Sequence, residues 1–211
     1  MTASAKHIRC LAGLILALGC MTASGQVLTS APTRTGEVYL FRGFANVFST
    51  GMDSLAAKLH GKGVQTRIYN HTAWKTVATE VVRRAKAGNV SYPVIIFGHS
   101  YGADACVLMA NYLGEQGVPV AYAVTFDPSH NSTAGPKIAK LVNYYVSDQD
   151  GVASNNVILR GKGFSGSIDN INVGKRPQEF GAVVHLTVDK NLRLHEMVSQ
   201  TVLSLTRPKS R

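Results

Sequence analysis

The hydrophobic positions of this chain fall into two kinds of segment, short apolar runs and longer stretches with a helical period. Five short runs predict strands, at residues 37–41, 65–69, 93–97, 120–126 and 141–146. Apolar residues spaced three and four apart predict helices, at residues 50–60, 74–86, 103–113 and 192–205. Strand and helix alternate along the chain. This order predicts an α/β fold in one domain, with a mainly parallel central sheet flanked by helices.

The run at residues 93–97 is apolar at almost every position, which favours a central strand covered on both faces. Thr50 and Asp53 have the spacing of a capping box, so we expect them to begin the first helix. In sheets of this kind, ligands bind at the carboxyl ends of the strands. We therefore look for chemistry where the predicted strands end.

The first 25 residues differ from the rest of the chain. Lys6 and Arg9 precede an apolar run at residues 10–18, and small residues follow up to Gly25, as in a secretory signal. We predict a signal peptide at 1–25, export to the periplasm or the medium, and a single domain at 26–211. The stretch ending at Cys20 also resembles a bacterial lipoprotein box, so a lipid anchor on Cys20 is the alternative.

The net charge of the chain indicates which classes of partner it can bind. The formal charge is +10, and loss of Lys6 and Arg9 with the signal leaves +8. A basic protein associates with polyanions, which include membrane surfaces with acidic head groups. The chain shows neither basic clusters interleaved with aromatics nor zinc-ligand spacing, so we expect no nucleic-acid partner. Cys106 is the one cysteine outside the signal, which excludes an intramolecular disulfide and favours a core thiol.

Residues 98–102 carry the clearest chemical signal. Their sequence, Gly-His-Ser-Tyr-Gly, follows the apolar run at 93–97 and precedes the predicted helix at 103–113. A G-x-S-x-G turn between a buried strand and a helix is the context of a nucleophile elbow, in which the serine hydroxyl projects above the sheet. We predict Ser100 as a nucleophile.

A serine hydroxyl needs a base, and the base in turn needs an acid to orient it. His185 stands in a predicted loop after an apolar run, whereas His195 lies inside the last helix, so we favour His185 as the base. Asp127 ends a strand in an Asp-Pro turn, and Asp148 follows the next strand. We favour Asp127 as the acid and keep Asp148 as the alternative.

An oxyanion needs two N–H donors. The Tyr101 N–H stands at a helix start, where the donors are free and the helix dipole is favourable. Gly43 lets the backbone approach closely after the first strand, and the Phe44 N–H is the second predicted donor. This chemistry calls for no metal and no organic cofactor.

The elbow, Arg42-Gly43 and His185 together resemble the α/β-hydrolase superfamily over most of residues 26–211. Asp127-Pro128 is similar to the acid of lipases and thioesterases that carry it one strand early. Residues 98–104, Gly-His-Ser-Tyr-Gly-Ala-Asp, resemble bacterial lipase-like proteins that act on phospholipid. Arg42 departs from the histidine found before the oxyanion glycine in many relatives. The chain has no long insertion, so we expect no cap domain and an open cleft.

These observations predict a serine hydrolase that cleaves a small-molecule or lipid ester, or a thioester, through an acyl-enzyme. Two alternatives stay open. One is a non-catalytic protein of the same fold that binds an anionic envelope ligand. The other is an acyltransferase that uses the same three side chains with an acceptor other than water.

Overall fold

The structure is a computed structural model that describes residues 26–27, 31–44 and 49–210. The predicted signal peptide and the Cys20 anchor lie outside the described residues. The central element is a seven-stranded sheet with the order β1-β3-β2-β4-β5-β7-β9, antiparallel at β1 and parallel between all other neighbours. Its strands are β1 (Gln26–Val27), β2 (Glu37–Arg42), β3 (Gln65–Asn70), β4 (Val94–His99), β5 (Val120–Phe126), β7 (Lys140–Tyr145) and β9 (Ser167–Asn172).

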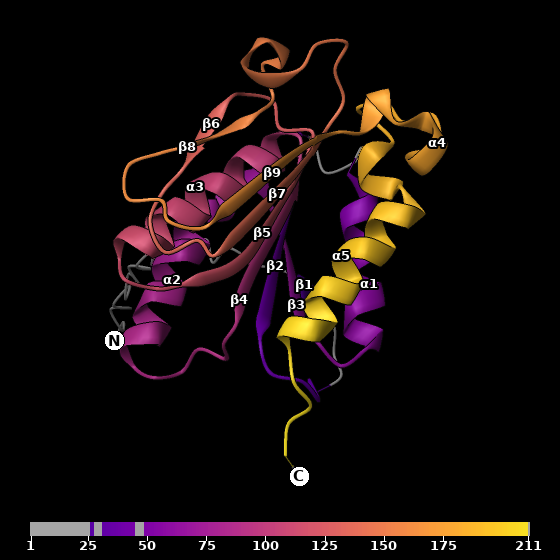
Figure 1. The fold of residues 1–211 in the computed structure, drawn as a ribbon. Coiled ribbons are helices and arrows are strands. Elements are labelled where there is room, and N and C mark those ends of the chain that lie inside the picture. The colour runs from indigo at the N-terminus through magenta and orange to yellow at the C-terminus, as the bar shows by residue number, and fades with distance from the viewer. Residues whose placement is uncertain (1–25, 28–30, 45–48, 211) are drawn as a thin grey trace, which may run out of the picture.

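Helices cover both faces of this sheet, as Figure 1 shows. The helices α1 (Thr50–Gly61) and α5 (Leu192–Leu205) lie on one face, and α2 (Trp74–Lys86) and α3 (Tyr101–Glu115) on the other. Each pair encloses its own apolar core against the sheet. The predicted α/β class, with a mainly parallel sheet in one domain, is confirmed. None of the helices in the described residues has the length and apolar character to cross a membrane.

The strict alternation of strand and helix predicted for the whole chain is wrong after β5. The connections from β5 to β7 and from β7 to β9 carry a small second sheet of β6 (Ser132–Ala134) and β8 (Ile158–Arg160). Ala134 and Ile158 join the core under α3, so this sheet takes the place of a covering helix. Three-residue strands are too short to give a period in the sequence.

Two further details differ from the sequence prediction. The residue before α1 is Ser49, whose side chain does not cap the helix, and the Asp53 carboxylate forms an ion pair with Arg42 instead of a capping box. The buried Asp189 carboxylate caps this helix end from another part of the chain, because it accepts the Gly51 N–H at 3.0 Å. The edge strand β9 was not predicted, since its sequence, Ser-Ile-Asp-Asn-Ile-Asn, is mostly polar. A short helix, α4 (Pro177–Phe180), and a 3₁₀ turn, η4 (Val188–Lys190), precede α5.

The first residue of β2, Glu37, places a buried carboxylate at the amino edge of the sheet. Glu37 is 2% exposed and accepts hydrogen bonds from Arg84 at 2.6 and 2.8 Å and from Arg67 at 3.0 Å. The Ser91 N–H donates to it at 2.9 Å, and the Tyr39 hydroxyl also donates. Burial alone would raise the pKa of Glu37, but these donors lower it to about 2. The cluster ties β2 to α2 and β3.

Candidate active site

Ser100 joins β4 to α3 in a strained backbone conformation, with φ 58° and ψ −127°. A side chain on Gly98 would meet the Gly102 carbonyl at 1.9 Å, and one on Gly102 would meet the Phe41 carbonyl at 2.2 Å. The turn is therefore too tight for any residue but glycine at both flanking positions. A non-glycine residue at positive φ persists only where its surroundings fix it. Here the Ser100 N–H donates to the Phe126 carbonyl on β5 at 3.0 Å.

The structure brings Ser100, His185 and Asp127 together in one hydrogen-bonded chain. The Ser100 hydroxyl lies 3.1 Å from Nε2 of His185, and Nδ1 of His185 lies 2.7 Å from Oδ2 of Asp127. The residues come from the elbow, the loop before η4 and the end of β5. Because Nδ1 faces a carboxylate it carries the proton, which leaves Nε2 free to accept the Ser100 proton.

The Asp127 carboxylate is buried and held from its other side. Its Oδ1 accepts the Val146 N–H at 2.9 Å and the Asn156 side-chain amide at 2.8 Å. Asp127 itself has φ 49°, and its N–H donates to the Tyr144 carbonyl at 2.8 Å. Asn156 was not foreseen from the sequence, since no motif places residue 156 near residue 127. Two donors on Oδ1 leave Oδ2 aimed at His185.

His185 is half-exposed, with 45% of its side chain accessible, whereas 3% of the Asp127 side chain is. The hydrogen bond to Asp127 raises the pKa of His185 above its usual 6.5, against the opposing effect of partial burial. The imidazolium that forms on taking a proton is therefore stabilised. The His185 ring is thus open to solvent on one side, whereas Ser100 is 9% exposed.

The loop after β2 lies directly against Ser100. A side chain on Gly43 would come within 3.0 Å of the Ser100 Cβ, so the backbone approaches here as predicted. The Gly43 N–H donates to the Ser49 hydroxyl at 2.8 Å, and the ring of Phe44 lies 6.4 Å from that of Tyr101. Tyr101 is the first residue of α3, where backbone N–H groups lack intrahelical partners. Residues 45–48 lie outside the described residues.

His99, the residue before Ser100, connects three loops. Its Nε2 lies 2.9 Å from the His185 carbonyl oxygen and its Nδ1 lies 2.8 Å from the Ser49 hydroxyl. Nε2 must carry the proton, because a carbonyl only accepts. Burial lowers the pKa of His99 to about 4, so the ring is neutral near pH 7 and Nδ1 accepts the Ser49 proton. Ser49 in turn accepts from Gly43, which links both loops beside Ser100 to the elbow.

Asp104, in the first turn of α3, organises the loop after Asp127. It accepts the Ser129 N–H at 3.1 Å, the His130 N–H at 3.3 Å and Nδ1 of His130 at 2.8 Å. The Ser129 hydroxyl then lies 3.4 Å from the Ser100 hydroxyl. The sequence showed Asp104 only as part of a family resemblance and gave no signal for Ser129.

The two alternatives considered from the sequence lie apart from this chain. His195 is buried in α5, where its Nε2 donates to the Asp189 carbonyl at 2.6 Å. Asp148 is exposed in the loop after β7. A third histidine, His71, does lie beside the candidate site. Its ring stacks on that of Tyr101 with centroids 5.5 Å apart, and its Nδ1 lies 3.3 Å from the Gly43 carbonyl oxygen. No group of acidic, histidine or cysteine side chains in the described residues could hold a metal ion.

Comparisons with known proteins give a fold and no close relative. No family model and no curated protein matches the sequence. Among solved structures, it is similar to the NocB thioesterase domain from the nocardicin cluster, with TM-score 0.54 and 12% identity over 86% of this chain and 99% of that one. It also matches the esterase Est1E from Butyrivibrio proteoclasticus, with TM-score 0.49 and 12% identity over 82% and 89% of the two chains. The predicted resemblance to the α/β-hydrolases is confirmed for the fold.

Proposed function

We propose that the protein is a serine hydrolase that cleaves an ester or a thioester through an acyl-enzyme. The observation that carries this proposal is the continuous hydrogen-bonded chain from Ser100 through His185 to the buried Asp127. The strained elbow supports it, because backbone strain is retained mainly where a function requires it. The thioesterase named in the comparison has the same fold at low identity, which favours ester and thioester chemistry without choosing between them.

The reaction follows from the proton positions. Ser100 attacks the substrate carbonyl while its proton passes to Nε2 of His185, and the negative charge of the tetrahedral intermediate is bound by the N–H groups of Phe44 and Tyr101. His185 then returns the proton to the leaving alcohol or thiol as the acyl-enzyme forms. A water molecule repeats the sequence, giving the free acid and Ser100. Asp127 holds the His185 ring and stabilises its charged form.

The setting of this reaction is also a proposal. The signal at residues 1–25 directs the protein to the periplasm or the medium, with Cys20 as an anchor point if that signal is of the lipoprotein kind. Mass spectrometry of the purified protein after expression in a bacterium gives the processed N-terminus. An unprocessed Met1 on protein recovered from the cytoplasm would contradict export.

A fluorophosphonate probe tests the nucleophile and the base. We expect labelling of the wild type at Ser100, no labelling of Ser100→Ala, and a loss of rate of about 10³-fold or more in His185→Ala. His195→Ala is the matched histidine control and should label at nearly the wild-type rate. No labelling of a folded wild type would contradict the hydrolase and favour a binding protein. Product analysis with a simple ester separates hydrolysis from transfer, since a transferase yields a new ester when an alcohol is added.

A further inference from the structure

Exposed apolar side chains gather around the candidate site. Ten large hydrophobic side chains are exposed in the described residues, and four of them stand at or beside site positions. Phe44 is 66% and Tyr101 43% exposed on one side of Ser100, while Val184 is 57% and Leu186 50% exposed on either side of His185. Leu192 follows them in the chain, and the other five line hollows elsewhere on the fold, one with Tyr92 and Leu205 and two more with Leu108, Val152 and Leu159. Such a concentration of apolar surface indicates a binding face.

The segment that carries His185 extends this apolar surface and adds charge. Leu192, at the start of α5, is 81% exposed, and Lys190 and Arg193 beside it are exposed. The acid of the segment, Asp189, is wholly buried. Residues 184–193 therefore present aliphatic side chains and positive charge to solvent, with no exposed acid among them.

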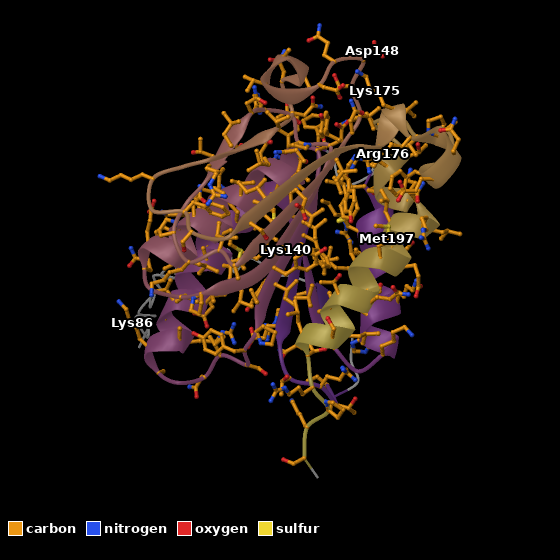
Figure 2. The ribbon with its side chains drawn as sticks, in the orientation of Figure 1. Lys86, Lys140, Asp148, Lys175, Arg176 and Met197 are labelled. Carbon is orange, nitrogen blue, oxygen red and sulfur yellow. The ribbon has the colours of Figure 1, made fainter. Side chains whose placement is uncertain are left out.

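Two basic residues near this segment, Lys175 and Arg176, add less positive charge to the surface, because each lies beside an acidic side chain. Figure 2 shows Lys175 and Arg176 at the end of the molecule where α5 begins. Lys175 pairs with Asp150 at 2.8 Å, and Arg176 lies 3.8 Å from Glu179. Within the part of the chain that the structure describes, Lys190 and Arg193 form no ion pair. Their charge is available to a partner.

We propose that Phe44, Tyr101, Val184, Leu186 and Leu192, together with Lys190 and Arg193, form a docking face for the surface of an anionic phospholipid bilayer. The apolar side chains would enter the region between head groups and acyl chains, and the two cations would lie at the level of the phosphates. A fluid lipid surface suits separate protruding side chains on two sides of a site. This inference rests on the proposed function for its purpose, which is delivery of lipid esters to Ser100.

Charge complementarity selects the lipid surface over other partners. Chain charge of +8 after loss of the signal attracts any anionic surface, and each basic residue close to such a membrane adds about 1 kcal/mol, or about fivefold in binding. The docking face combines that attraction with exposed aliphatic area. A second copy of the chain would bring the same positive charges together.

Vesicle co-sedimentation tests the face in the processed protein carrying Ser100→Ala, which cannot turn over lipid. We expect binding to vesicles of phosphatidylglycerol and phosphatidylcholine that falls with salt, and much weaker binding to phosphatidylcholine alone. Lys190→Gln with Arg193→Gln should weaken binding about 25-fold, and Leu192→Ser about tenfold. The charge control is Lys86→Gln with Lys137→Gln, which removes two exposed lysines at the end of α2 and beside the amino ends of β4 and β5, away from Ser100. The apolar control is Leu108→Ser, which removes an exposed leucine from α3.

Equal losses in the face variants and their controls would overturn the proposal, since binding would then depend on net charge alone. So would the absence of vesicle binding, or a dimer in light scattering that Leu192→Ser dissolves. Far-ultraviolet circular dichroism checks that each variant is folded. Because the Ser100→Ala background is inactive by design, failure of vesicle binding is separate from failure of the hydrolase proposal, which the fluorophosphonate probe decides.

Discussion

His99 donates its Nε2 proton to the carbonyl oxygen of His185, so the residue before the candidate nucleophile holds the loop that carries the candidate base. The two rings lie 5.1 Å apart. The opposite ring nitrogen accepts from Ser49, which holds the backbone of Gly43. One buried imidazole thus sets the spacing of the elements that carry the candidate nucleophile, the candidate base and a predicted oxyanion donor.

Substitutions of His99 separate its two bonds. In His99→Gln the side-chain amide reaches the position of Nε2 and still donates to the His185 carbonyl, whereas His99→Asn reaches only the position of Nδ1. We expect kcat to fall about 100-fold in His99→Asn and clearly less in His99→Gln, because small displacements of reacting groups are costly. Steady-state kinetics on a soluble ester and the rate of probe labelling measure this.

A purely structural role of His99 predicts another result. Each variant loses one buried hydrogen bond, so both should lose a similar 1 to 3 kcal/mol of unfolding free energy, to within about a factor of two. Wild-type activity per folded molecule in both variants would show that neither bond positions the site.

The pH dependence of labelling follows from His185. Its pKa is raised above 6.5 by Asp127, and only the neutral ring accepts the Ser100 proton. The rate should therefore fall as the pH drops through a midpoint above 6.5. Asp127→Asn removes the charge that raises this pKa, so the midpoint should move to lower pH and the maximal rate should fall about 10³- to 10⁴-fold. Asp148→Asn is the control and should keep both values.

Asp189 gives a pH dependence of stability that opposes the usual one. Burial raises the pKa of Asp189 to about 6, against several weaker favourable contacts. A raised pKa stabilises the folded state at low pH, and this contribution is lost between the unfolded value of 3.8 and about 6, at a cost of up to about 3 kcal/mol. Asp189→Asn should therefore be more stable than wild type at pH 8 and should gain little at pH 4. Urea unfolding at the two pH values measures the difference, and an equal effect at both would contradict it.

Glu37 changes the stability with pH in the opposite direction to Asp189. Its pKa is lowered to about 2, so its contribution is complete above the unfolded value of 4.5 and is lost as the pH falls toward 2. Glu37→Gln should cost about 3 kcal/mol of unfolding free energy at pH 7, because Arg84 and Arg67 lose their buried partner. Glu80→Gln removes an exposed pair with Arg83 and a longer contact with Arg84 at 3.9 Å, and should change the free energy of unfolding by less than about 0.5 kcal/mol.

The sequence was sufficient for the parts of this fold that bury apolar residues in a regular period. The strand at β4 and the helices α1, α2, α3 and α5 were all predicted close to their observed bounds. The edge strand β9 was missed, because an edge strand that is mostly polar lacks the pattern that marks a buried one. The small sheet of β6 and β8 was missed because neither strand exceeds three residues.

The site divides in the same way. Ser100, Asp127 and His185 were chosen from a local motif, a strand end and chain order, and the structure brings them within hydrogen-bonding distance. Their chemical roles stay predictions. Asn156 and Ser49 act through contacts between residues far apart in the chain, and no single-sequence pattern indicates such pairs. The Thr50–Asp53 capping box was wrong, since a nearby arginine competes for the carboxylate.

The Ser100 N–H is bonded to β5 and the Asp127 N–H to β7, so the reactive geometry depends on three docked strands that are distant in sequence. A partly folded chain lacks this arrangement, even where its helices have formed. Under the proposed function, the fraction labelled by a fluorophosphonate is therefore the fraction of native molecules. Refolding followed by quenched labelling would report completion of the sheet, while circular dichroism reports the helices, and a lag between the two signals would time the last step of assembly.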